Sequence, residues 1–237
     1  MALPKLETPK HSCVLPITNN TVYFRPFLIG EQKVLLMAQE SEDQQLVVKE
    51  LIRLLNSCCD DLIAEKLNTV DLEYLFLQVR IKSVGETADI ILNCEQCDIE
   101  NQVSVELEKV EVPNKDQMID PNVKITEDII MEFQYPTYTI LNTIDTGDGD
   151  DIKTEQLFKL ISKCVVSITN GDEVHSRDDF TDKELNEFIE SMSTDMFARV
   201  NDFFDSLPKL VIDFNYSCSG CQHNNNLVLE GIANFFE

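Results

Sequence analysis

Basic residues are scarce in this sequence. Its 237 residues include 19 Lys and Arg against 43 Asp and Glu, which gives a formal net charge of -24 at pH 7. A surface that binds nucleic acid needs clustered Lys and Arg to displace the counterions of the phosphates. Anionic membranes attract basic segments in the same way. The composition therefore predicts a protein that binds neither nucleic acid nor membranes.

Glycine and histidine are also rare, with seven and three residues. The sequence has no glycine-rich loop that could cradle a phosphate and no G-x-S-x-G nucleophile elbow. His11 and His175 have no partner at the spacing of metal ligands or of a catalytic triad. These absences disfavour an enzyme, and no catalytic residue is predicted.

Long apolar runs are missing as well. The longest, in residues 71–81, is interrupted by Glu73 and Arg80 and is too short to cross a bilayer. The first eight residues contain proline and charges where a signal peptide would have its apolar segment. We therefore expect a protein kept in a reducing cytoplasm, where cysteines more often bind metals or lie in the core than form disulfides.

The sequence nevertheless contains enough apolar residues to fold, because 43% of it is hydrophobic. Its patterns predict four consecutive segments. They are an N-terminal arm with the first helix (1–60), a helix with a hairpin and a strand (61–135), a helical insertion (136–208), and a second hairpin (209–237).

Hydrophobic periodicity assigns elements to the first half of the chain. Four prolines in residues 1–30 predict an extended arm with a short strand at 21–24. Apolar residues at helical spacing predict one helix over 43–58 and another from about residue 69 to 85. Strict alternation over 87–112 then predicts a β-hairpin.

The second half combines helical and alternating patterns. Residues 123–134 are predicted to form one strand that ends before Pro136. A helical pattern extends over 137–207, and Thr181 with Glu184 is typical of a capping box at a helix start. Alternation over 210–229 predicts the second hairpin.

The two predicted hairpins carry the same cysteine motif, Cys94-Glu-Gln-Cys97 and Cys218-Ser-Gly-Cys221. Two such hairpin tips brought together supply four thiolates, the tetrahedral ligand set that zinc accepts. The sequence therefore predicts one structural zinc ion bound by all four cysteines. Gly220 suits a tight turn with a positive φ, although Gln96 occupies the equivalent position in the first motif.

Other interpretations of these cysteines remain open. A redox Cys-x-x-Cys motif usually lies at a helix N-terminus, whereas both motifs here lie between strands. A disulfide, coincidence, and substitution of His223 for Cys221 are further alternatives. The remaining cysteines are expected to be small buried or half-buried residues: Cys13, Cys58, Cys59 and Cys164.

The expected fold is thus α+β. It combines zinc-ribbon-like β-hairpins bearing two Cys-x-x-Cys knuckles with a helical insertion and an extended N-terminal arm.

Residues 13–41 resemble the opening of the baseplate hub proteins of T-even-like contractile-tailed phages. The residues that carry this resemblance are Arg25-Pro26-Phe27, Glu31, Lys33 and Leu35-Leu36-Met37-Ala38. The resemblance implies a non-enzymatic protein of tail morphogenesis, whose partners are other baseplate hub or tail proteins. It would act in the host cytoplasm during assembly and could remain in the virion, because the family includes both virion components and assembly factors.

The N-terminal segment also suits a contact surface. Residues 1–60 contain seven acidic and six basic residues, so they are nearly neutral in a chain of net charge -24. An exposed cation, proline and aromatic ring could anchor a partner, which predicts a partner-binding role for Arg25, Pro26 and Phe27. Alternatively, they pack on the helix of 43–58. An acidic DNA mimic, a thiol-disulfide protein and a homo-oligomer also remain open.

Overall fold

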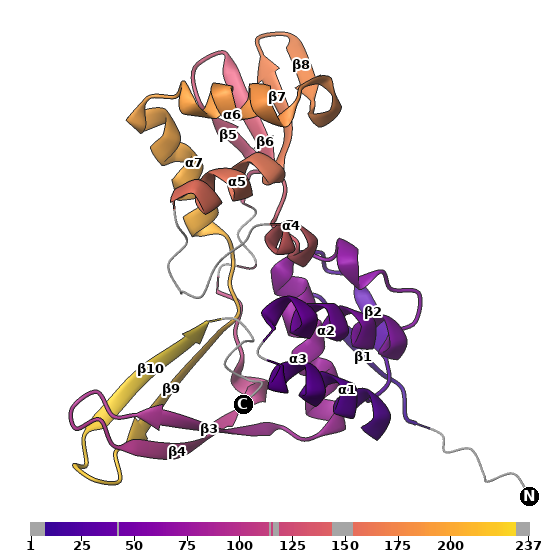
Figure 1. Ribbon diagram of the computed structural model, residues 1–237, viewed down its shortest axis with the longest axis vertical. Coiled ribbons are helices and arrows are strands. Elements are labelled where there is room, and N and C mark those ends of the chain that lie inside the picture. Colours follow the sequence, from indigo (N-terminus) through magenta and orange to yellow (C-terminus); the bar gives the residue numbers. More distant parts are fainter. Residues whose placement is uncertain (1–7, 42, 114, 116–118, 144–153, 231–237) are drawn as a thin grey trace, which may run out of the picture. The chain divides into compact units, whose positions relative to one another are not determined.

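The computed structural model describes residues 8–41, 43–113, 115, 119–143 and 154–230. The chain divides into two compact units. The first unit consists of residues 1–115 and 208–237, and the second, residues 116–207, lies between these two parts in the sequence. Within the described residues there are seven α-helices and four small sheets, so the fold is α+β as predicted (Figure 1). No helix of this described part is long and apolar enough to cross a membrane.

The first unit begins with a β-hairpin. Strand β1 (His11–Val14) pairs antiparallel with β2 (Thr21–Phe24). The carboxylate of Asp71, which is fully buried, accepts hydrogen bonds from the backbone N–H groups of Ile17 and Thr18 in the connecting turn, at 2.8 and 3.1 Å. The predicted strand at 21–24 is confirmed, but it pairs with β1, so residues 11–24 form a hairpin and not an extended arm. The prolines flank the two strands and leave the N–H groups of the ladder intact.

Three helices follow the hairpin. They are α1 (Ile29–Glu40), α2 (Gln44–Cys58) and α3 (Thr69–Ser83), with a 3₁₀ turn at Ala64–Lys66. The structure confirms the two predicted helices, α2 and α3. Helix α1 was not predicted, because its apolar residues are spread around the helix and form no single stripe.

Two hairpins complete the first unit. Strand β3 (Thr87–Asn93) pairs with β4 (Glu100–Glu106), and β9 (Val211–Ser217) pairs with β10 (Asn224–Glu230). Both hairpins are confirmed. A short 3₁₀ turn, Leu107–Lys109, follows β4, and an isolated antiparallel bridge joins Glu111 to Val211 at the start of β9. The two hairpins thus begin side by side, and Figure 1 shows their tips at the same end.

The second unit contains an antiparallel four-stranded sheet in the order β5 (Asn122–Lys124), β6 (Ile129–Phe133), β7 (Val165–Asn170) and β8 (Glu173–Ser176). Its helices are α4 (Tyr138–Asn142), α5 (Thr154–Cys164), α6 (Asp182–Glu190) and α7 (Thr194–Ser206), and a 3₁₀ turn spans Arg177–Asp179. Side chains from the sheet and the helices share one core, which includes Met131, Phe133 and Ile161.

Two predictions for this unit need correction. The strand predicted over 123–134 is two strands, β5 and β6, joined by a turn. The segment predicted as a helical insertion also contains β7 and β8, while its residues 144–153 lie outside the described part. Strand β7 follows α5 with no glycine or proline between them, and every residue of β8 is exposed. Neither strand therefore gave a clear period-two signal. The capping box of Thr181 and Glu184 at α6 is confirmed.

Candidate metal centre

The tips of the two hairpins bring the four predicted cysteines together. The Sγ atoms of Cys94, Cys97, Cys218 and Cys221 all lie within 4.8 Å of one another. The Cys94 and Cys221 sulfurs are 3.7 Å apart, and those of Cys97 and Cys218 are 3.5 Å apart. With a zinc–sulfur bond of about 2.3 Å, the edge of a tetrahedral site is about 3.8 Å. The spacing therefore fits one tetrahedral metal ion shared by both hairpins.

The two cysteine turns have the same backbone geometry. The N–H of Cys94 donates to the carbonyl of Ile99, and that of Cys218 donates to the carbonyl of His223. Positive φ values occur at Asp98 (59°) and Gln222 (61°), which are each the fourth residue after the first cysteine of the motif. His223 thus contributes a backbone carbonyl to its turn, and its side chain is not part of the cysteine cluster.

The prediction that Gly220 would adopt a positive φ is wrong. A Cβ atom at this position would lie 2.4 Å from Cδ1 of Ile99 in the other hairpin. Gly220 therefore lies directly against the end of the exposed Ile99 side chain, which a larger residue at this position would displace. Only the folded structure, with both hairpins in place, could reveal this contact.

Backbone N–H groups point toward the sulfurs. The N–H of Gln96 donates to Sγ of Cys94, and the N–H of Gly220 donates to Sγ of Cys218, both at 3.4 Å. The backbone N–H groups of Cys221 and Gly220 lower the pKa of Cys218 to about 6, against the effect of desolvation. These donors favour the thiolate, which is the form that binds a metal.

The four cysteines differ in exposure. Cys94 and Cys218 are buried, Cys97 is half-buried and Cys221 is exposed. The hydroxyl of Tyr216 on β9 donates to the carbonyl of Asn93 at the end of β3, at 3.0 Å, which adds a further bond between the hairpins. We searched the described residues for groups of His, Cys, Asp or Glu side chains close enough to share a metal ion. These four cysteines are the group found.

The remaining cysteines lie in or near the core, as predicted. Cys58, Cys59 and Cys164 are buried and Cys13 is half-buried. Burial raises the pKa of Cys58, Cys59 and Cys164 to about 12, and that of Cys13 to about 11. Thiols with such pKa values stay protonated at neutral pH and are poor nucleophiles.

The residues predicted to bind a partner are partly occupied by intramolecular bonds. The Arg25 guanidinium forms a two-pronged ion pair with Glu31, at 2.8 and 2.9 Å, and donates to the backbone carbonyl and the hydroxyl of Ser57 at 3.1 Å. The N–H of Phe27 donates to the hydroxyl of Ser83 at 2.9 Å. Arg25, Pro26 and Phe27 are half-buried. These bonds join the start of α1 to the ends of α2 and α3, and the partner-binding role stays a prediction.

Glu31, one of the residues that carry the resemblance to hub proteins, has a structural role that was not predicted. One of its carboxylate oxygens accepts a bond from the N–H of Leu28 at 2.7 Å and so caps α1. The hydrogen bonds from Arg25, followed by those from Ser57 and Leu28, lower the pKa of Glu31 to about 2 despite partial burial. The signal was an acidic residue three positions into the helix, where it can cap the free N–H groups.

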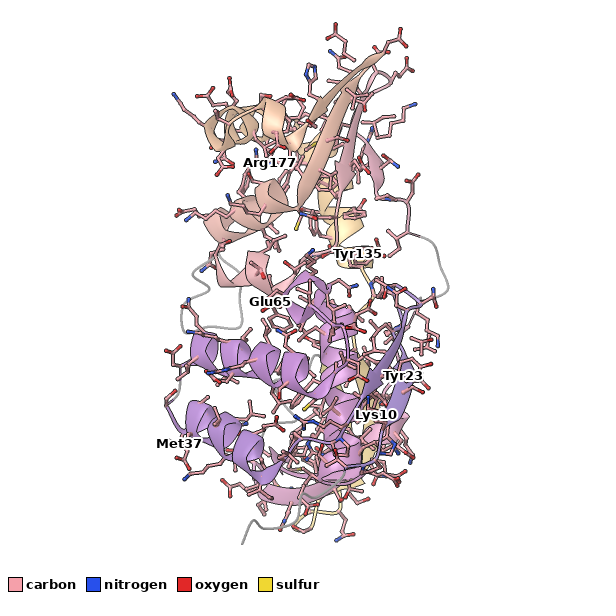
Figure 2. The ribbon with its side chains drawn as sticks, turned by 90° about the vertical axis from the view of Figure 1, so that its right-hand side faces the viewer. Lys10, Tyr23, Met37, Glu65, Tyr135 and Arg177 are labelled. Carbon is pink, nitrogen blue, oxygen red and sulfur yellow. The ribbon has the colours of Figure 1, made fainter. Side chains whose placement is uncertain are left out.

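Helix α1 exposes large apolar side chains. Its outer side carries Ile29, which is 81% exposed, Met37 at 58% and Leu36 at 49%, while Leu35 and Ala38 face the core. Met37 lies at the outer edge of α1 in Figure 2. Exposed apolar side chains that gather on one side of a helix can mark a surface that contacts a partner. The outer side of α1 is therefore a candidate contact surface, and it immediately follows Arg25, Pro26 and Phe27 in the sequence.

Comparison with protein-family models gives one match. The family described as "T4 bacteriophage base plate protein" matches residues 8–237, which include both units. No curated protein and no solved structure matches the chain.

Proposed function

Because the chain belongs to the family of T4 bacteriophage base plate proteins, we propose that it acts in the assembly or structure of the central hub of a phage baseplate. In this proposal it works without catalysis, through contacts with other hub or tail proteins. The match over residues 8–237 is the observation that carries the proposal. The narrower assignment to the hub rests on the resemblance of residues 13–41 to hub proteins.

The cysteine cluster supports a structural role for a metal. We propose that Cys94, Cys97, Cys218 and Cys221 bind one zinc ion and that the two hairpins form a zinc-ribbon-like element. Four protein thiolates fill the tetrahedral coordination sphere of zinc, so no position remains for a water molecule or a substrate. In this role the ion would hold β3–β4 against β9–β10, two hairpins that are separated in the sequence by the whole second unit.

The outer side of α1 is the contact surface that the structure favours. Its exposed side chains Ile29, Leu36 and Met37 lie in a segment of nearly balanced charge, within a strongly acidic chain. An apolar, weakly charged surface of another baseplate protein could cover them without electrostatic repulsion. Arg25, Pro26 and Phe27 would lie at the edge of this contact.

Replacing Ile29 and Met37 by aspartate is expected to weaken binding to hub proteins at least tenfold, about 1.4 kcal/mol or more, with little effect on folding. Both side chains are exposed, so their replacement removes little packing within the chain. The measurement is the affinity for purified hub and tail proteins, together with the melting temperature. Val174→Asp is the matched control, because Val174 is 64% exposed in β8. If the double variant binds as well as the control, α1 is not the contact surface.

The hub role itself is tested in infected cells. A phage that lacks this protein is expected to accumulate tail intermediates without a completed hub, and supplying the protein from a plasmid should restore tails. A DNA mimic would instead leave tail assembly intact and alter a host DNA-binding activity. Normal tails in the absence of the protein would contradict the proposal.

A further inference from the structure

Two buried asparagines lie beside the cysteine cluster. Asn101 in β4 is 6% exposed and Asn225 in β10 is fully buried. The alignment that pairs Cys94 with Cys218 also pairs these two asparagines, since each is the seventh residue after the first cysteine of its motif. A buried amide needs partners for its N–H groups and its oxygen. Both asparagine side chains must therefore have hydrogen-bond partners within the fold.

Asn225 bonds to the cysteine turn of the other hairpin. Its side-chain amide donates to Sγ of Cys94 at 3.6 Å, and its Oδ1 accepts from the backbone N–H of Glu95 at 3.0 Å. The same amide also donates to the carbonyl of His223 in its own hairpin, at 3.3 Å. The side chain thus joins the two hairpins at the first thiolate of the first motif.

Asn101 makes the reciprocal set of bonds. Its amide donates to Sγ of Cys218 at 3.7 Å, and its Oδ1 accepts from the backbone N–H and the hydroxyl of Ser219, at 2.8 and 2.9 Å. The amide also donates to the carbonyl of Ile99 in its own hairpin, at 2.7 Å. Each asparagine therefore holds the residue pair that begins the opposite motif, Cys94-Glu95 or Cys218-Ser219.

The crossed pattern places neutral donors on the two buried thiolates. A divalent ion with four thiolates carries two net negative charges, which are costly to bury in an acidic protein unless hydrogen bonds compensate them. Among the described residues outside the four cysteines, the hydrogen-bond donors to Cys94 and Cys218 are two backbone N–H groups and these two amides. The amides are the donors that a substitution can remove.

We propose that Asn101 and Asn225 are positioning residues of the metal centre, which fix the two buried thiolates in ligand geometry and compensate their charge from the opposite hairpin. This inference rests on the proposed metal site. It assigns to the site two residues that bind no metal themselves. Outer-shell partners of this kind typically change metal affinity 10- to 100-fold when they are replaced.

The test uses the full-length chain, with cobalt(II) as a spectroscopic probe and zinc in competition with a chromophoric chelator. In Asn101→Asp and Asn225→Asp a carboxylate oxygen replaces the donating amide and faces the sulfur. We expect each variant to bind zinc at least tenfold more weakly and to shift the sulfur-to-cobalt charge-transfer band. The matched controls Gln102→Glu and Asn226→Asp make the same change one residue along the same strands, at exposed positions, and should stay within twofold of the wild type.

The outcomes separate the two proposals. A wild-type chain that takes up neither cobalt nor zinc overturns the metal site itself. A wild-type chain that binds metal, with aspartate variants that match their controls in affinity and spectrum, overturns the role of the asparagines and leaves the metal site standing. A purely structural role would lower the melting temperature of the metal-free chain while leaving the cobalt spectrum of the folded variant unchanged. If an aspartate variant does not fold, Asn→Ser at the same position, which removes the donor without adding charge, gives the same comparison.

Discussion

One zinc ion per chain is expected in the purified protein, and changing Cys94, Cys97, Cys218 and Cys221 together to serine is expected to abolish it. Metal binding contributes on the order of 10 kcal/mol to the folding of small zinc domains. The effect on this chain should be smaller, because fully buried residues such as Leu55, Leu72 and Leu75 form a core that needs no metal. We expect the two hairpins to lose their ordered pairing while the helices remain.

Metal analysis and hydrogen exchange measure this result. Exchange should accelerate in β3, β4, β9 and β10 and remain slow in α3. Cys13→Ser is the matched control, because Cys13 lies outside the cluster and should leave the zinc content unchanged. Absence of zinc from the wild type, or zinc that persists in the fourfold serine variant, would contradict the site.

Loss of the Arg25 side chain is expected to destabilise the fold by about 2 kcal/mol. Arg25 and Glu31 are only 24% and 22% exposed, and a two-pronged ion pair of this kind is stronger than a surface pair. Arg25→Ala leaves the Glu31 carboxylate without its cation and removes the two bonds from Arg25 to Ser57 in α2, while the hydroxyl of Ser57 still donates to Glu31. Lys10→Ala is the control, since the side chains of its ion pair with Asp60 are 69% and 53% exposed and the pair should contribute at most about 1 kcal/mol.

The loss of stability in Arg25→Ala is expected to depend on pH. The pKa of Glu31 is lowered to about 2 in the folded chain, against an ordinary value of 4.5. Its contribution to stability is therefore fully present above pH 4.5 and is lost as the pH falls toward 2. The difference in melting temperature between the wild type and Arg25→Ala should shrink over that range. If Arg25→Ala melts like the wild type at pH 7 but no longer binds hub proteins, Arg25 is an interface anchor and this stabilising role is wrong.

Regular local patterns made much of the fold predictable. The apolar stripe of α2, the boundaries of α3 and the alternation in both hairpins are set by residues close together in the sequence. The same holds for the duplicated Cys-x-x-Cys motif. Elements without such a pattern were missed, namely α1, whose apolar residues form no single stripe, and β8, which is exposed throughout.

The asparagine pair shows where a sequence signal was present but had no meaning by itself. Asn101 and Asn225 occupy equivalent positions in the two motifs. The spacing of the motifs does not indicate that each amide contacts the other hairpin. Similarly, Arg25 and Glu31 are only six residues apart, but the groups of Ser57 and Cys58 that contact their ion pair come from α2.

The sequence by itself determined the chemistry of this protein. It specified four cysteines at paired hairpin tips, a net charge of -24, and the helices and hairpins whose apolar periodicity is local. Only the tertiary structure decided which groups meet. It placed four sulfurs within 4.8 Å of one another, brought Gly220 against Ile99, and crossed the two asparagines between the hairpins. The physical reason is that these contacts join residues more than 100 positions apart, and their geometry depends on how the whole first unit packs.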